Sequence, residues 1–202
     1  LIESEKRGIM ASILFKDAGL LVSSGKGFSY IPKGYLGVEG EYIDYIGQDA
    51  PEKEYGEVRN SEGLILTPGF VNCHGHSAMN LLRGVGSDLP LSDWLHVMWP
   101  IEDRMNEDDL RCGMNLAIME MLSSGTTSFT DMYLMPWCVA ETIGESGIKA
   151  NFSRVMQDFQ LLDDKRYDSH YRVNETEDHY RPWHNSHDGR LQVLYAVHDE
   201  YS

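Results

Sequence analysis

Two histidines separated by a single glycine give the sequence its clearest chemical signal. His74 and His76 follow the apolar segment 70–73, which is predicted to be a β-strand. Side chains at positions i and i+2 of a strand point to the same side. Two imidazoles at one strand end can therefore bind one metal ion. The pair alone leaves a second interpretation open, in which both are ordinary polar residues at a strand end.

The segments that must position this pair alternate between strand and helix patterns from Thr67 onward. Predicted strands cover residues 70–73, 126–132, 149–156 and 191–197, and a short helix is predicted over 137–145. Such alternation is typical of parallel β/α units. Four units make half of an eight-stranded barrel, which takes about 250 residues in full. A four-stranded open sheet is the structural alternative.

A longer helix is predicted between the first two of these strands. Asn106 can cap its start and Gly125 can close it. The acidic residues 107–109 suit the positive end of the helix dipole. Apolar residues then recur with the spacing of one buried helix face: Leu110, Met114, Ala117, Ile118, Met121 and Leu122.

The first 66 residues have a different pattern, with short strands separated by glycine turns. Predicted strands cover 12–15, 20–23, 35–38, 42–46 and 64–66. The dipeptide Gly40-Glu41 lies between two of them and is typical of a tight hairpin turn. The polar stretch 49–60 is predicted to be a loop. Together these features predict a small antiparallel sheet or sandwich.

The composition excludes several classes of protein. Hydrophobic residues make up 42% of the chain and charged residues 24%, which is typical of a globular protein. The net charge of −15 argues against a nucleic-acid partner. No run of about 18 apolar residues occurs, so no membrane span is predicted. The three cysteines form no C-x-x-C pair, which favours a reduced, cytoplasmic protein.

The remaining histidines give weaker signals. His96 lies on a predicted short helix and is expected to be structural. Four more lie in the polar stretch 163–189, where no compact ligand spacing occurs, and are expected to be solvated surface residues: His170, His179, His184 and His187.

The histidine pair belongs to a longer motif, LTPGFVNCHGH at residues 66–76. This motif resembles the first barrel strand of the amidohydrolase superfamily. Further segments narrow the resemblance to the branch that holds the 5′-methylthioadenosine/S-adenosylhomocysteine deaminases and the triazine chlorohydrolases. They are MNLLRG at 79–84, LPLSDWL at 89–95, WPIE at 99–102, SGTT at 124–127 and DMY at 131–133.

The resemblance implies an α/β fold, the N-terminal part of a metal-dependent hydrolase (β/α)8 TIM barrel with a small β-sandwich domain. Residues 1–66 then form the N-terminal part of the small domain. Residues 67–202 form the first half of the amidohydrolase barrel, strands 1–4. Because Ser202 directly follows a predicted strand, we expect a larger protein, with the rest of the barrel in cis or in another chain.

The same resemblance implies roles for five residues. His74 and His76 are the implied metal ligands. Glu102 matches a carboxylate that grips ribose hydroxyls, and its two acceptor oxygens suit the two donors of a vicinal diol. Arg154 and His198 match residues that contact the substrate. The alternatives are a solvated carboxylate for Glu102 and a structural ion pair for Arg154.

One divalent metal ion is expected, with zinc preferred and iron as the alternative. Dinuclear family members carry a carboxylated lysine at the fourth strand end, where this chain has no lysine. The motif there is HDEY at 198–201, whereas the family commonly has HAPY or HAEY, so Asp199 departs from the pattern. No catalytic residue is predicted within this chain, because the general acid and base are expected after Ser202.

The expected activity is hydrolytic deamination of an adenosine-type nucleoside of the 5′-methylthioadenosine/S-adenosylhomocysteine class. The metal lowers the pKa of a bound water to about 7. The hydroxide then attacks the ring carbon that carries the amino group, and ammonia leaves. The expected partners are a small-molecule purine nucleoside and further copies of the chain in a homo-oligomer, and neither nucleic acid nor a membrane.

Two other functions remain open. The first is an amidohydrolase for another heteroaromatic ring, such as guanine, a triazine or a cytosine-like ring. The second is a truncated, inactive homologue that acts as a binding module. Residues 1–202 alone are expected to be inactive, because half a barrel leaves its fourth strand as an unpaired edge.

Overall fold

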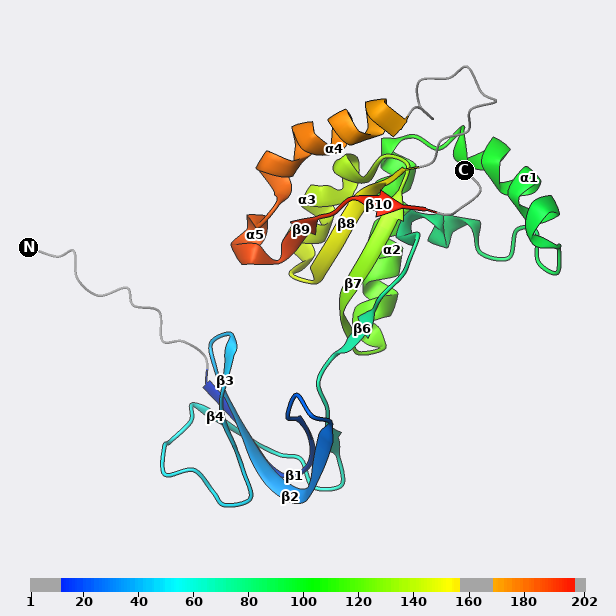
Figure 1. Cartoon of the computed structure of the whole chain (residues 1–202). Helices are drawn as coiled ribbons and strands as arrows, with labels where there is room; N and C mark the ends of the chain where they lie inside the picture. Colours follow the sequence, from blue (N-terminus) through cyan, green and yellow to red (C-terminus); the bar gives the residue numbers. More distant parts are fainter. Residues whose placement is uncertain (1–11, 157–168, 199–202) are drawn as a thin grey trace, which may run out of the picture. The chain divides into compact units, whose positions relative to one another are not determined.

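The computed structural model describes residues 12–156 and 169–198 (Figure 1). The chain divides into two compact units, which are Leu1–Pro68 and Gly69–Ser202. We refer to them as unit 1 and unit 2.

Unit 1 is a mixed five-stranded β-sheet. Strands β1 (Ser12–Ser23), β2 (Phe28–Glu39) and β3 (Tyr42–Gly47) pair in antiparallel fashion. Strands β4 (Glu57–Asn60) and β5 (Ile65–Leu66) both run parallel to β1. The predicted hairpin turn is confirmed, because Glu39 pairs with Tyr42 across Gly40-Glu41. Gly40 has φ 59°, a conformation that glycine adopts without steric cost.

Two features of unit 1 differ from the sequence-based prediction. The predicted strands 12–15 and 20–23 are one strand, β1, whose pairing is irregular around Asp17 (φ 61°). Strand β4 lies inside the predicted loop 49–60, so the sheet is mixed rather than purely antiparallel. All four residues of β4 are exposed, and an exposed strand has no alternation of buried and polar residues to reveal it.

Unit 2 contains a parallel sheet in the strand order β10-β8-β7-β6. The first three strands are β6 (Phe70–Asn72), β7 (Thr126–Tyr133) and β8 (Lys149–Met156). The predicted fourth strand is divided into β9 (Leu191–Val193) and β10 (Ala196–Val197), which pair with successive parts of β8. The prediction of parallel β/α units is confirmed.

Helices connect these strands. In chain order they are η1 (Ser77–Leu82), α1 (Leu91–Glu102), α2 (Glu107–Ser123), η2 (Pro136–Val139), α3 (Ala140–Ser146), α4 (Ser169–Trp183) and α5 (Ser186–Gly189). The cap of α2 is as predicted: the Asn106 side chain accepts from the backbone N–H of Asp108 and Asp109. The Asp109 carboxylate accepts from the Asn106 N–H in return. None of the helices in the described residues has the length and apolar composition of a membrane span.

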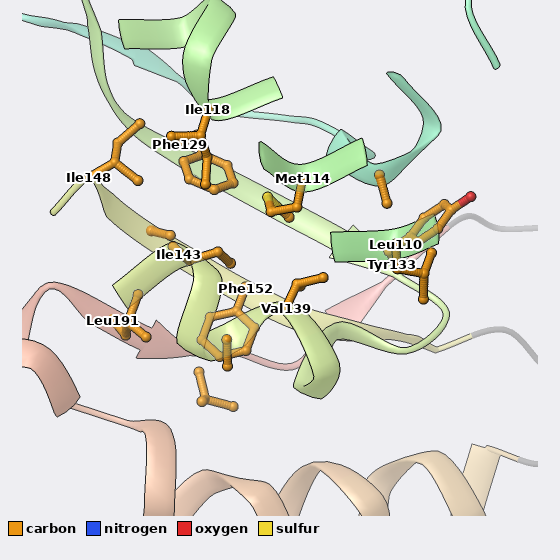
Figure 2. Close-up of a cluster of buried hydrophobic side chains, with 14 residues drawn as sticks. Leu110, Met114, Ile118, Phe129, Tyr133, Val139, Ile143, Ile148, Phe152 and Leu191 are labelled. Atoms are coloured by element: carbon orange, nitrogen blue, oxygen red, sulfur yellow. The ribbon is translucent and has the colours of Figure 1, made fainter. Parts of the chain in front are cut away.

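The core of unit 2 lies between the sheet and helices α2 and α3 (Figure 2). Phe129 of β7 and Phe152 of β8 are fully buried, as are Met114 of α2 and Ile143 of α3. Burial of such side chains stabilises the fold by about 1.5–3 kcal/mol each. Because strand side chains alternate, the residues that share a face with Phe129 and Phe152 all point toward the helices. We call this the helix-covered face.

Candidate active site

His74 and His76 lie together just beyond the end of β6. Their ring centroids are 4.9 Å apart and the rings are nearly perpendicular. Strand β6 ends at Asn72, so neither histidine is part of a strand, and the alternation of strand side chains does not explain their proximity. The segment after β6 must instead be held in place by its neighbours.

The end of β7 holds the backbone and ring of His76. The backbone N–H of Met132 donates to the carbonyl oxygen of Gly75 at 3.1 Å. The Met132 carbonyl lies 2.7 Å from Nδ1 of His76. Because a carbonyl only accepts hydrogen bonds, Nδ1 carries a proton, and in the neutral imidazole the lone pair is then on Nε2. This arrangement is the usual one for a metal-binding histidine, whose second nitrogen is oriented by a backbone carbonyl or carboxylate.

Asp131 supports the same segment from the buried side of β7. Its Oδ1 accepts a hydrogen bond from the backbone N–H of Ser77 at 2.6 Å. The side chain is almost completely buried, and this burial raises the pKa of the carboxyl above its ordinary value. Gly113 adds a steric requirement, because a Cβ there would collide with the carbonyl oxygen of Ala78 in η1. The histidine segment is therefore fixed by both β7 and α2.

His198 approaches His76 from the fourth strand position. It directly follows β10, and its ring centroid is 5.6 Å from that of His76. Strands β7 and β8 lie between β6 and β10, so a flat sheet would separate the two outer strands by about 14 Å. The short distance between the rings means that the sheet curves and brings its two outer strand ends toward each other.

Glu102 is brought to the same end of the sheet through Tyr133. Glu102 is the last residue of α1, and Tyr133 is the last residue of β7. The Tyr133 hydroxyl donates to Oε1 of Glu102 at 2.6 Å. The centroid of the Tyr133 ring is 6.5 Å from that of His76. Burial and the negative charge of Glu102 raise the pKa of Tyr133 above its ordinary value, so the phenol stays a donor.

Arg154, which lies on β8, forms an ion pair with a residue of α4. It lies two residues beyond Phe152 and so points to the helix-covered face. Its Nε is 3.4 Å from a carboxylate oxygen of Glu175 in α4, and the pair is largely buried. The other oxygen of Glu175 accepts from Nε1 of Trp137 at 3.1 Å. This is the ion pair that the sequence left open as the alternative for Arg154, and a substrate contact at this residue stays a prediction.

Three histidines of the polar stretch 163–189 are half-buried rather than solvated. Each lies against an aromatic ring with small interplanar angles: His179 on Trp137, His184 on Tyr180 and His187 on Trp183. His184 also accepts a hydrogen bond from the backbone of Val193. The expectation of surface solvation was wrong for these three. Trp137 comes from a segment distant in sequence, whereas Tyr180 and Trp183 each lie four residues before their histidine. The side chain of His170 lies outside the described residues.

The described residues offer part of a metal site but not a full one. Within 12–156 and 169–198, no three His, Cys, Asp or Glu side chains are grouped closely enough to hold a metal ion. His74 and His76 nevertheless fit two positions of a larger ligand set, because imidazole is a good ligand for zinc and iron. A pocket of about 760 Å³ borders His76 and extends between η1, α1 and α2.

A family assignment follows from comparison with known proteins. Residues 65–202 match the model described as the amidohydrolase family. The chain belongs to this family. The prediction made from the histidine motif is thereby confirmed for this amidohydrolase.

Curated relatives of the amidohydrolase are considerably longer. The 5-methylthioadenosine/S-adenosylhomocysteine deaminase of Syntrophomonas wolfei subsp. wolfei is 40% identical over 161 residues. The match covers 76% of this chain and 37% of that relative. The chain therefore spans less than two fifths of the length of this relative.

Solved structures share the fold. An adenosine deaminase from Xanthomonas campestris, solved with bound zinc, has a TM-score of 0.79 at 24% identity, covering 93% of this chain and 43% of its own. A triazine hydrolase from Arthrobacter aurescens has a TM-score of 0.79 at 14% identity, covering 94% and 48%. The prediction of the N-terminal part of a metal-dependent hydrolase TIM barrel is confirmed by the family match and these structures.

Proposed function

We propose that this amidohydrolase is the N-terminal part of a metal-dependent hydrolytic deaminase for an adenosine-type nucleoside of the 5′-methylthioadenosine/S-adenosylhomocysteine class. One observation carries the proposal. The imidazoles that follow β6 and β10 meet at the carboxyl end of the sheet, and Tyr133 links them to the carboxylate of Glu102. Active sites of TIM-barrel enzymes lie at this end of the strands.

His74 and His76 are the proposed ligands of one divalent ion, zinc or iron. The hydrogen bond from Nδ1 of His76 to Met132 supports this role, because it leaves Nε2 with a lone pair. When bound, the ion supplies an activated water for the hydrolysis. The remaining ligands and the group that moves protons are proposed to come from barrel strands beyond residues 1–202.

Glu102 and His198 are proposed to hold the substrate. The Glu102 carboxylate has two acceptor oxygens, which match the two hydroxyl donors of a ribose diol. His198 lies beside His76, where a purine undergoing deamination has to sit. The name of the S. wolfei relative specifies two adenosine derivatives that share this ribose, which supports a nucleoside over a triazine. For Arg154, the pair with Glu175 favours the structural alternative.

We also propose a domain assignment and a cellular location for the protein. Residues 1–66 are the N-terminal part of a small β-sandwich domain, and residues 67–202 are barrel strands 1–4. The observed division after Pro68 supports this assignment. Cys73, Cys112 and Cys138 are all free thiols, which supports a reducing cytoplasm. A homo-oligomer stays a prediction.

The test of this function compares a nucleoside with its free base. It uses protein with a complete barrel, whose remaining strands are in the same chain or supplied as a second chain. In Glu102→Ala, kcat/KM for 5′-methylthioadenosine should fall roughly tenfold to hundredfold, because an unsatisfied polar partner costs about 1–3 kcal/mol. For adenine, which has no ribose hydroxyls, the loss should be less than about threefold.

Asp103→Ala is the matched control, because it removes an exposed carboxylate from the adjacent position. In this variant, kcat/KM for 5′-methylthioadenosine and kcat/KM for adenine should both stay close to the wild-type values. An equal loss for the nucleoside and the base in Glu102→Ala would remove the ribose assignment. Absence of deamination of every adenosine-type nucleoside by the wild-type protein would remove the proposed function as a whole.

A further inference from the structure

The hydrogen bond between Tyr133 and Glu102 joins a rigid donor to a flexible acceptor. The Tyr133 ring is buried within the core of unit 2, with 6% of the residue exposed. Its position is therefore set by packing around the end of β7. Glu102 is only partly buried at the end of α1 and lies 31 residues away in sequence. A glutamate in such a position has several rotamers unless a partner selects one.

The chemistry of the two groups makes Tyr133 the partner that selects the rotamer. A phenol has one hydrogen to donate, and the Glu102 carboxylate is 2.6 Å away while the Met105 sulfur is 3.9 Å away. The carboxylate is the stronger acceptor because it carries a charge. Within the described residues, Tyr133 is the only side chain that hydrogen-bonds this carboxylate.

The same hydrogen bond leaves most of the carboxylate available to a ligand. An ionised carboxylate has about four lone-pair sites, and the phenol occupies one of them, on Oε1. The other sites remain on Oε1 and Oε2, which is sufficient for both hydroxyls of a vicinal diol. Tyr133 therefore orients Glu102 without consuming its capacity to bind.

Tyr133 also fixes the position of Glu102 relative to His76. Tyr133 makes two contacts. Its hydroxyl donates to Glu102, and its ring centroid is 6.5 Å from that of His76. A single buried ring thus sets the spacing between the diol-binding group and the metal-binding segment. A nucleoside has a fixed distance between its ribose and its amino-bearing carbon, so this spacing matters for catalysis.

We propose that Tyr133 is a positioning residue for substrate specificity, which orients the Glu102 carboxylate so that it receives the diol of a ribose beside His76. The inference rests on the proposed nucleoside deaminase function. Tyr133 acts through Glu102 and itself touches no reacting atom. It follows that the residue affects nucleosides and leaves the free base nearly unaffected.

The experiment is a double-mutant cycle of Tyr133→Phe and Glu102→Ala in protein with a complete barrel. Tyr133→Phe keeps the ring and removes only the hydroxyl. For 5′-methylthioadenosine, kcat/KM should fall about tenfold, mainly through a higher KM. For adenine the change should be less than about twofold. In the Glu102→Ala background, Tyr133→Phe should have no further effect on the nucleoside.

Tyr55→Phe is the matched control, because Tyr55 also donates its hydroxyl to a carboxylate, Asp44, at 2.9 Å, but in unit 1. It should change neither substrate's kinetics. An equal loss on nucleoside and base in Tyr133→Phe, or a full tenfold loss in the Glu102→Ala background, would mean that the hydroxyl serves the fold, and the inference would be overturned. These outcomes require an active wild type, whereas an inactive wild type overturns the proposed function and this inference with it.

Discussion

Two polar clusters of unit 2 use charged and aromatic side chains in opposite ways. At the ends of β6 and β10, His74 is exposed and Nε2 of His76 keeps a lone pair after its partner nitrogen has bonded Met132. On the helix-covered face of β8, Arg154 and Glu175 bury each other, and Trp137 bonds the second oxygen of Glu175. The first cluster, which we call open, has capacity for a ligand, while the second, which we call closed, buries its two charges against each other.

This difference shows that residue type alone does not identify a binding residue. His76 lies just after a predicted strand and Arg154 lies within one, and both match residues of the same family. The structure separates them by the partner that each has acquired, the Met132 carbonyl for His76 and the Glu175 carboxylate for Arg154. The predictions below test that separation, beginning with the variant of largest expected effect.

His76→Ala tests the open cluster. In protein with a complete barrel, we expect loss of the bound metal and a fall in kcat/KM of a thousandfold or more, which corresponds to about 4 kcal/mol. Metal content per chain, measured by mass spectrometry after gel filtration, gives a readout that does not depend on activity. His96→Ala is the control, since the contacts of His96 in the described part of the chain, with the Ser92 carbonyl and the Trp99 ring, both lie within α1. Equal metal content in His76→Ala and the wild type would contradict the assignment.

Arg154→Met tests the closed cluster. Removal of one partner leaves the Glu175 charge partly buried without its cation, so the free energy of unfolding should fall by about 3 kcal/mol. Urea unfolding followed by fluorescence measures this loss. Glu175→Gln should destabilise in the same direction, because the two residues act as a pair. If Arg154→Met instead keeps full stability and raises KM for the nucleoside, Arg154 belongs with the substrate and the comparison between the clusters fails.

Arg83→Ala should have the smallest effect. Arg83 pairs with Glu120, but the two side chains are 62% and 44% exposed. Exposed ion pairs contribute about 0–1 kcal/mol, so the unfolding free energy should change by less than about 1 kcal/mol. Measured beside Arg154→Met, this variant shows whether burial sets the difference. A loss as large as that of Arg154→Met would show that it does not.

Local signals in the sequence were sufficient for several elements. Helix α2 was predicted correctly because Asn106, its acidic first turn and Gly125 all act within a few residues. The β2–β3 hairpin was predicted for the same reason, since Gly40-Glu41 is a short-range turn signal. Strand β4 and the division between β9 and β10 were not predicted, because their bounds depend on pairing with β1 and β8, which are distant in sequence.

In the candidate site as well, local motifs predicted the residues, whereas their contacts depended on tertiary packing. The sequence by itself determined the family, the histidine pair and the identity of Glu102 and His198 as candidates, because these are carried by contiguous motifs. Only the tertiary structure decided that His198 meets His76, since this needs the curvature of a sheet in which two other strands intervene. The pairing of Tyr133 with Glu102 and of Arg154 with Glu175 likewise arose from packing between segments that no local pattern connects.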